Sequence, residues 1–233
     1  MKWRNGLDLR FADRRLEDAF WIQHDHTTWD QVRIASWLGI GLFGFFGLLA
    51  DQVITRGFTA DDILRYGIAM PGILLGIILS YFRRFDRWRP IYVSFSILVS
   101  AAVSNAALAV TDLPTDWAHS ANMLVVGFNF TFIALRFRIA LINALIQAVM
   151  YEIALVDRVG WDWLYLTYSN TFFFSVLFVS ATAGFMLEKS YRRNFLQARK
   201  LDEQRALAEE NRALSDTLLL NILPAAVADR LRT

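Results

Sequence analysis

The chain has 233 residues, with 24 Lys+Arg against 22 Asp+Glu, so its formal charge is 24 − 22 = +2. Hydrophobic residues make up 55% and charged residues only 20%, and the charges are crowded into both ends and a few short segments. This distribution excludes intrinsic disorder and a single soluble domain, and the absence of cysteine excludes a disulfide scaffold. We interpret the sequence as an all-α polytopic membrane protein: a six-transmembrane-helix bundle with a long cytoplasmic exit helix.

The first segment, residues 1–31, is charged and has no apolar region of the kind found in a cleavable signal peptide. From Phe11 to Gln31 the apolar side chains, among them Phe20 and Trp21, recur on one side of a predicted helix. This pattern is typical of an amphipathic helix lying on the inner face of a membrane. A loosely ordered tail is the alternative.

Residues 32–187 hold six stretches of about 20 mostly apolar residues, the length that a helix needs to cross a bilayer. The predicted spans are Val32–Ala50, Ile63–Phe82, Ile91–Val110, Ala118–Leu135, Ile139–Val156 and Tyr165–Leu187. Pro71 and Gly72 lie in the middle of the second span, and Asn122 and Asn129 weaken the fourth.

The Lys/Arg bias of the short loops predicts the orientation of the spans. Basic residues precede span one, separate spans two and three and spans four and five, and follow span six, whereas the alternate loops are mainly acidic. Six spans with both termini in the cytoplasm agree with the charge of every loop. The basic rim is spread over several loops, which favours anionic membrane lipid as a partner and not nucleic acid.

Ionisable side chains at the outer ends of the spans are the candidate binding residues, because such groups are costly in a membrane and often functional. Asp51 and Asp112 end spans one and three, and Arg65 and Glu152 lie within spans two and five. Together they predict an acidic outer pocket for a cation or an amine. The alternative is that Glu152 pairs with Arg65 or lies among lipid headgroups. No other group of residues predicts a metal site, since His24, Asp25 and His26 lack further ligands nearby.

The last segment, residues 188–233, is rich in strong helix formers and has neither Gly nor Pro between Gly184 and Pro224. Span six is therefore expected to continue into the cytoplasm as one helix. Its Leu residues recur with an imperfect heptad spacing, which favours weak homodimerisation over a strong coiled coil. Pro224 then predicts a kink followed by a short helix.

The segment from Leu218 to Leu231 reads LLLNILPAAVADRL. It resembles the helical element that precedes the catalytic domain of class III nucleotide cyclases, whose pattern is Leu-Leu-x-Asn-Ile/Met-Leu-Pro-x-x-Val/Ile-Ala-x-Arg-Leu. Every fixed position of that pattern is matched. With six short-looped spans upstream, the chain is similar to bacterial membrane-bound adenylate cyclases that have one six-helix domain per chain.

The resemblance implies that this chain is the membrane part of a protein of the bacterial inner membrane that converts ATP to cyclic AMP and pyrophosphate. It implies a homodimer, a cyclase catalytic domain following in the same protein, and Mg or Mn bound by that domain; no cofactor is expected in this chain, which lacks the family's strand with metal-binding aspartates. The residues expected to transmit a signal are Leu218, Asn221, Leu223, Pro224 and Arg230.

Two other functions remain open from the sequence. The domain could instead regulate another signalling enzyme, such as a histidine kinase or a diguanylate cyclase. Such an enzyme would not require Asn-x-Leu-Pro followed by Arg six residues after the Pro. It could also be a small transporter, although only Pro71–Gly72 breaks a span and the second half has no counterpart.

Overall fold

The structure, a computed structural model, describes residues 3–5, 8–52, 60–110 and 115–222. It is an all-α fold preceded by a short antiparallel hairpin of β1 (Trp3–Asn5) and β2 (Asp8–Phe11). The helices are α1 (Arg14–Ala50), α2 (Ala60–Leu64), the π-helical η2 (Arg65–Ala69), α3 (Met70–Ser80), the 3-10 segment η3 (Arg83–Trp88), α4 (Arg89–Val110), α5 (Thr115–Thr131), α6 (Phe137–Val159) and α7 (Trp163–Ile222). The chain divides into two compact units, Met1–Glu188 and Lys189–Thr233, which are described separately.

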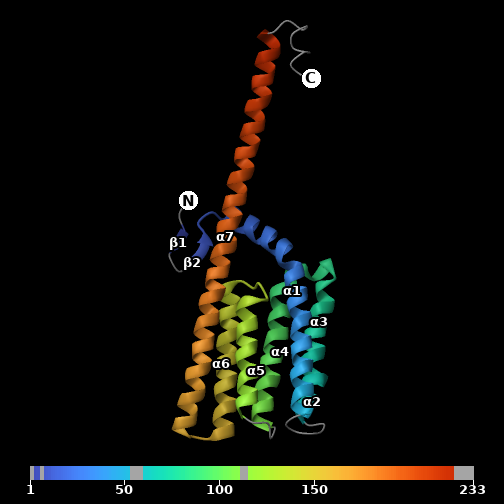
Figure 1. Cartoon of the computed structure of the whole chain (residues 1–233), viewed down its shortest axis with the longest axis vertical. Helices are drawn as coiled ribbons and strands as arrows, with labels where there is room; N and C mark the ends of the chain where they lie inside the picture. Colours follow the sequence, from blue (N-terminus) through green and yellow to red (C-terminus); the bar gives the residue numbers. More distant parts are fainter. Residues whose placement is uncertain (1–2, 6–7, 53–59, 111–114, 223–233) are drawn as a thin grey trace. The chain divides into compact units, whose positions relative to one another are not determined.

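Helix α1 joins the expected amphipathic segment and the first expected span in one continuous helix (Figure 1). It begins at Arg14 and not at Phe11, because the Asp13 carboxylate accepts a hydrogen bond from the Arg15 amide, 2.9 Å away, and caps the helix. Phe11 ends strand β2 instead, which corrects the prediction of helix from that residue. The one-sided pattern is confirmed, since Phe20 and Trp21 are buried and pack ring against ring.

The second expected span forms the continuous helical run α2–η2–α3, which ends at Ser80 and not at Phe82. Its π-helical turn immediately precedes Pro71, where the Met70 amide donates to the Arg65 carbonyl. A proline ring clashes with the carbonyl four residues earlier in a regular helix, and the wider turn relieves this crowding. The expected break at Pro71 is therefore a local bulge in an otherwise continuous helix.

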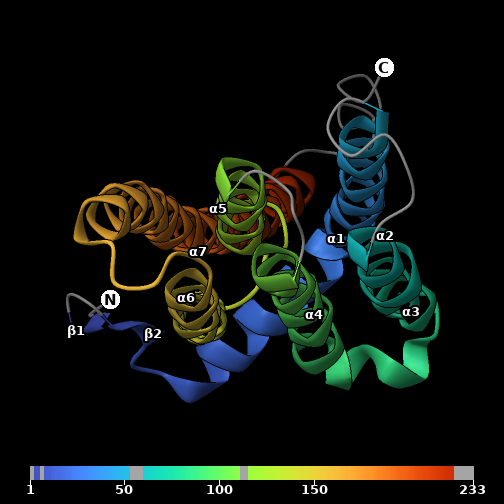
Figure 2. The same ribbon diagram turned by 90° about the horizontal axis from the view of Figure 1, so that it is seen from below.

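Two hydrophobic cores lie within the unit Met1–Glu188. One is formed where α1, α4 and α5 meet and includes Val32, Ile97 and Val125. The other joins α5, α6 and the first part of α7 and is centred on Tyr151, whose ring stacks on Phe173 at 4.1 Å between centroids. In the view from below, α4 lies between α6 and α3 (Figure 2). Helix α4 contributes to both cores and so connects the two halves of the bundle.

The fourth expected span is shorter than predicted, and its predicted end is wrong. Helix α5 has 17 residues and ends at Thr131, four residues before Leu135. The connection to α6 includes Ala134 with φ of 49°, a left-handed conformation that does not continue a helix. Ile133 and Leu135 pack against the first core, so their hydrophobicity reflects loop packing and not helix.

The turn between α6 and α7 is determined by two residues. Gly160 has φ of 62° and its amide donates to the Val156 carbonyl, 2.9 Å away, which ends α6. The Asp162 carboxylate then accepts from the amides of Leu164 and Tyr165 at 3.0 and 3.2 Å and starts α7. From there α7 is unbroken over 60 residues, as the lack of Gly and Pro after Gly184 predicts.

Five helical runs are long and apolar enough to cross a membrane: Arg14–Ala50, Ala60–Ser80, Arg84–Ala109, Phe137–Val159 and Trp163–Leu218. Helix α5, with 17 residues, is not among these five runs. The two ends of the bundle differ in charge. We call the end that holds Arg33, Arg89 and Arg136 the basic end, and the end that holds Asp51 and Asp61 the acidic end.

Candidate functional site

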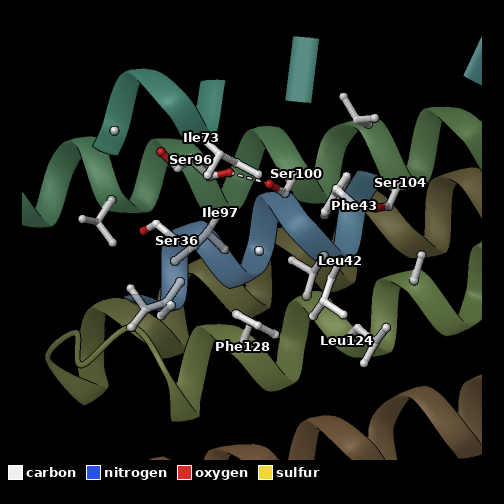
Figure 3. Close-up of a pocket in the computed structure, with 18 of the residues that line it drawn as sticks. Ser36, Leu42, Phe43, Ile73, Ser96, Ile97, Ser100, Ser104, Leu124 and Phe128 are labelled. Atoms are coloured by element: carbon white, nitrogen blue, oxygen red, sulfur yellow. Dashed lines mark hydrogen bonds between the residues drawn. The ribbon is translucent and has the colours of Figure 1, made fainter. Parts of the chain in front are cut away.

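A cavity of about 110 Å³ lies inside the bundle, lined by residues of α1, η2, α3, α4 and α5 and by Ile133 (Figure 3). Its walls are mostly apolar, as shown by Leu42, Phe43, Leu124 and Phe128. On α4 the lining extends from Tyr92 to Ala107, which is about 22 Å of helix at 1.5 Å per residue. We call this space the central cavity.

Three serines of α4, Ser96, Ser100 and Ser104, line the central cavity one turn apart. Ser100 donates to the Ser96 carbonyl at 2.8 Å, and Ser96 is within hydrogen-bonding distance of both its own helix and the Gly72 carbonyl of α3. The small side chains on this face let α3 and α4 approach closely at Ser96. At Ser100 and Ser104 the same small side chains leave open space, which the sequence analysis did not predict.

An arginine lines the central cavity at each end. At the basic end, Arg33 donates to Ser80 Oγ and to the Ser80 carbonyl at 3.2 and 2.6 Å, and its guanidinium lies over the rings of Trp29 and Tyr81. At the acidic end, Arg65 donates to the Phe43 carbonyl at 3.1 Å and forms a buried ion pair with Asp61. The cavity therefore offers apolar surface and hydroxyl groups along its length, with guanidinium groups at both ends.

The structure separates the residues of the expected outer pocket. Asp51 and Arg65 belong to one cluster with Asp61 and Asp62, in which burial and the neighbouring Asp62 carboxylate raise the pKa of Asp51. Arg65 pairs with Asp61 and not with Glu152, so that alternative is wrong in this structure. Asp112 lies outside the described residues.

Glu152 belongs to a different place, between α6 and α7, where its Oε2 accepts a hydrogen bond from the Asn170 side-chain amide at 3.3 Å. A second pocket, of about 540 Å³, is lined there by residues of both helices and of the turn between them. Across the described part of the chain, no group of three or more His, Cys, Asp or Glu could hold a metal ion.

Two of the five expected transmission residues, Leu218 and Asn221, lie at the end of α7. Leu218 is exposed on the last turns of the helix, and Asn221 lies within its helical bounds. Leu223, Pro224 and Arg230 fall outside the described residues, so the predicted kink stays a prediction.

At the basic end the structure has polar contacts between helices that were not predicted from sequence. The arginines of this end had served only to predict the orientation of the chain. The buried Arg89 of α4 donates to the Asp25 carbonyl and to Thr28 Oγ, each at 2.9 Å, and so ties α4 to α1. Glu188 of α7 accepts a hydrogen bond from the first amide of α6, at Phe137, at 2.7 Å. A carboxylate at a helix N-terminus is a recurrent stabilising contact, but its partner helix is not evident from sequence.

No protein-family model matches this chain, and no similar curated protein or solved structure was found. The resemblance to class III cyclases therefore depends on the residues of the segment 218–231 and on the expected layout of spans. Any functional conclusion must be drawn from those residues and from the geometry described above.

Proposed function

We propose that this chain is the membrane domain of a class III adenylate cyclase, which anchors, pairs and regulates a catalytic domain that follows it. One observation carries the proposal: the segment Leu218–Leu231 matches the cyclase element at every fixed position, and α7 connects the bundle to it as one helix. The parent protein would convert ATP to cyclic AMP and pyrophosphate. The localisation proposed is the bacterial inner membrane, with both termini in the cytoplasm.

The distribution of side chains around α6 supports the membrane location. Its large apolar side chains point outward, with Ile142, Val149 and Ile153 exposed by 57%, 61% and 67%. Its inward face carries small and polar residues, including Ala144 and Gln147, both fully buried. This arrangement suits a helix whose outer surroundings are lipid and whose inner contacts need close approach and hydrogen bonds.

Polar residues between the helices act as the interhelical contacts that such a bundle needs. Asn129 of α5 donates to the Ala140 carbonyl of α6 at 2.7 Å, and Gln147 of α6 donates to the Asn122 carbonyl of α5 at 3.0 Å. These contacts attach α5 to its neighbour at two levels. They support counting α5 as the fourth of six crossings despite its 17 residues.

A homodimer is the assembly that we propose for the second unit. Within it Leu201, Leu207, Leu214 and Leu218 are about half exposed on α7, and their spacing follows an imperfect heptad. Pairing of two such helices would bury these side chains and bring the two transducer elements together. The resemblance to cyclases requires that pairing, since the family's active site is shared between two chains.

Regulation would act by favouring one of two packings of the bundle. The central cavity leaves room for helices to repack around α4, and the Glu188 contact makes α7 responsive to movement of α6. Because α7 has no break before Ile222, a change at Glu188 would be carried along the helix to the cyclase element.

The experiment is a cyclic AMP assay on membranes from cells that express the complete gene, comparing Pro224→Ala and Asn221→Ala with the unchanged protein. Both substitutions should change the rate of cyclic AMP formation at least several-fold, because they alter the element that orients the catalytic domains. Ser215→Ala on the same helix is the matched control and should leave the rate unchanged. Equal rates for all four proteins would refute the proposed role of the element.

A further inference from the structure

Glu152 is a carboxylate inside an apolar helix without a compensating cation. Its one hydrogen bond is the 3.3 Å contact from Asn170 to Oε2, and among the described residues no Lys, Arg or His pairs with it. Arg65, which the alternative interpretation of the sequence paired with Glu152, forms its ion pair with Asp61 instead. An ionised carboxylate in such a place requires a partner, because burial of an unpaired charge is strongly unfavourable.

Two acceptor oxygens at this place have no hydrogen-bond donor within the described structure. They are Glu152 Oε1 and Asn170 Oδ1, both shielded from solvent and both belonging to residues that line the pocket between α6 and α7. Buried acceptors are nearly always satisfied in folded proteins. The pair therefore indicates a missing donor, and a donor that also carries positive charge would satisfy the carboxylate as well.

This pocket has a mixed lining, with three aromatic rings and two aliphatic side chains beside Glu152, Asn170, Thr167 and Thr171. Trp161 and Trp163 belong to the turn and the start of α7, with ring centroids 6.0 Å apart, and Phe174 lies three turns along α7. The pocket volume of about 540 Å³ is within the range of small-molecule sites, roughly 300–1,000 Å³. Indole faces attract organic cations, and the hydrocarbon part of such a ligand would contact Phe174.

We propose that this pocket binds a primary alkylammonium ion. Its N–H groups would donate to Glu152 Oε1 and Asn170 Oδ1, and its alkyl chain would lie against the aromatic walls. A divalent metal ion fits less well, since Ca²⁺ is usually held by several carboxylates and Glu152 is the one carboxylate among the residues that line this pocket. The site requires the bundle alone and is independent of the cyclase output, so it can be tested apart from the proposed function.

The test is equilibrium dialysis of hexylammonium against the purified full chain in lipid nanodiscs, with 1-hexanol as the neutral probe. Saturable binding of one hexylammonium per chain is expected, with no saturable binding of hexanol. Hexyltrimethylammonium should bind at least threefold more weakly, because it has the charge but no N–H donor.

Three variants locate the site. Glu152→Gln should weaken hexylammonium binding about tenfold or more, since a charge-assisted hydrogen bond is lost. Asn170→Ala should weaken it about threefold to tenfold, and it serves as the second variant if the first does not fold. Asp157→Asn removes an exposed acid from the same helix and should leave binding within twofold.

The proposal is overturned by any of four results, of which the first three concern binding of the organic probes. These are no saturable hexylammonium binding, equal binding by the unchanged protein and a folded Glu152→Gln variant, and equal affinity for hexylammonium and its trimethyl analogue. Displacement of hexylammonium by millimolar Ca²⁺ through Glu152 would also overturn it, by assigning the site to a metal ion.

Discussion

Two glycines with different surroundings, when replaced by alanine, are expected to change the stability of the protein in opposite directions. A Cβ added at Gly39 of α1 would meet nothing within 4 Å, whereas one at Gly76 of α3 would lie 2.5 Å from Ser96 Oγ. Replacing a helical Gly by Ala is favourable by about 1 kcal/mol when space allows. Gly39→Ala should therefore raise the midpoint of thermal unfolding by about 2–4 °C for a chain of this size.

Gly76→Ala should lower the midpoint instead. The Ser96 side chain would have to move, losing its 3.2 Å contact with the Gly72 carbonyl, and overpacking of this kind costs about 1–3 kcal/mol. The net loss is then about 0–2 kcal/mol after the helix gain of about 1 kcal/mol. In a Ser96→Ala background the nearest atom is a Cβ at 3.7 Å, an ordinary contact, so Gly76→Ala should become stabilising there.

The assay is circular dichroism during thermal unfolding in detergent micelles, applied to the unchanged protein and five variants. These are Gly39→Ala, Gly76→Ala, Ser96→Ala and the two double variants that combine Ser96→Ala with each glycine substitution. A coupling free energy of about 1–3 kcal/mol between positions 76 and 96 is expected, and none between positions 39 and 96. If Gly76→Ala stabilises the protein as much as Gly39→Ala, the close approach of α3 and α4 at Ser96 is refuted.

The same unfolding assay tests both ends of the bundle. Arg65→Met should lower the free energy of unfolding by about 3–5 kcal/mol, because it leaves the buried Asp61 unpaired. Adding Asp61→Asn should recover more than half of this loss, and the control Arg158→Met, at an exposed position, should change the free energy of unfolding little. A loss below 1 kcal/mol for Arg65→Met would show that the pair is hydrated. Glu188→Gln should cost about 1 kcal/mol through the weakened contact at the start of α6, and an unchanged midpoint would argue against that contact. Burial and the neighbouring Asp62 carboxylate raise the pKa of Asp51 above its ordinary value of 3.8. The folded chain therefore binds the Asp51 proton more tightly than the unfolded chain does. The free energy of unfolding should fall as the pH rises from 3.8 through the raised pKa. Asp51→Asn should remove that dependence, and equal pH profiles of the two proteins would contradict it.

The long helices could be predicted because their hydrophobic stretches are long and their ends carry local signals. Gly160 and Asp162, two residues apart, are a turn residue and a cap residue, and α6 ends and α7 begins there. The end of α5 could not be predicted in this way, since Leu135 is as apolar in a packed loop as it would be in a helix. Strands β1 and β2, of three and four residues, are too short to show a periodic pattern.

The candidate site was only partly predictable, because sequence does not show which helices of a membrane bundle are neighbours. Asp51 and Arg65 lie on consecutive helices and do belong to one cluster. Glu152 lies on α6 and accepts a hydrogen bond from Asn170 on the next helix. The sequence thus predicted one pocket, whereas the structure places Glu152 apart from the cluster of Asp51 and Arg65. The spacing of four residues between Asp61 and Arg65 was the available signal for their ion pair.

The central claim is that this bundle is the membrane domain of an adenylate cyclase. The rate of cyclic AMP formation tests it most directly. Membranes from cells that express the complete gene should form cyclic AMP from ATP in the presence of Mg²⁺ or Mn²⁺, and membranes from cells with an empty vector should not. No cyclic AMP above the empty-vector control, with the protein present in the membranes, would contradict the account and leave the helical bundle without an assigned output.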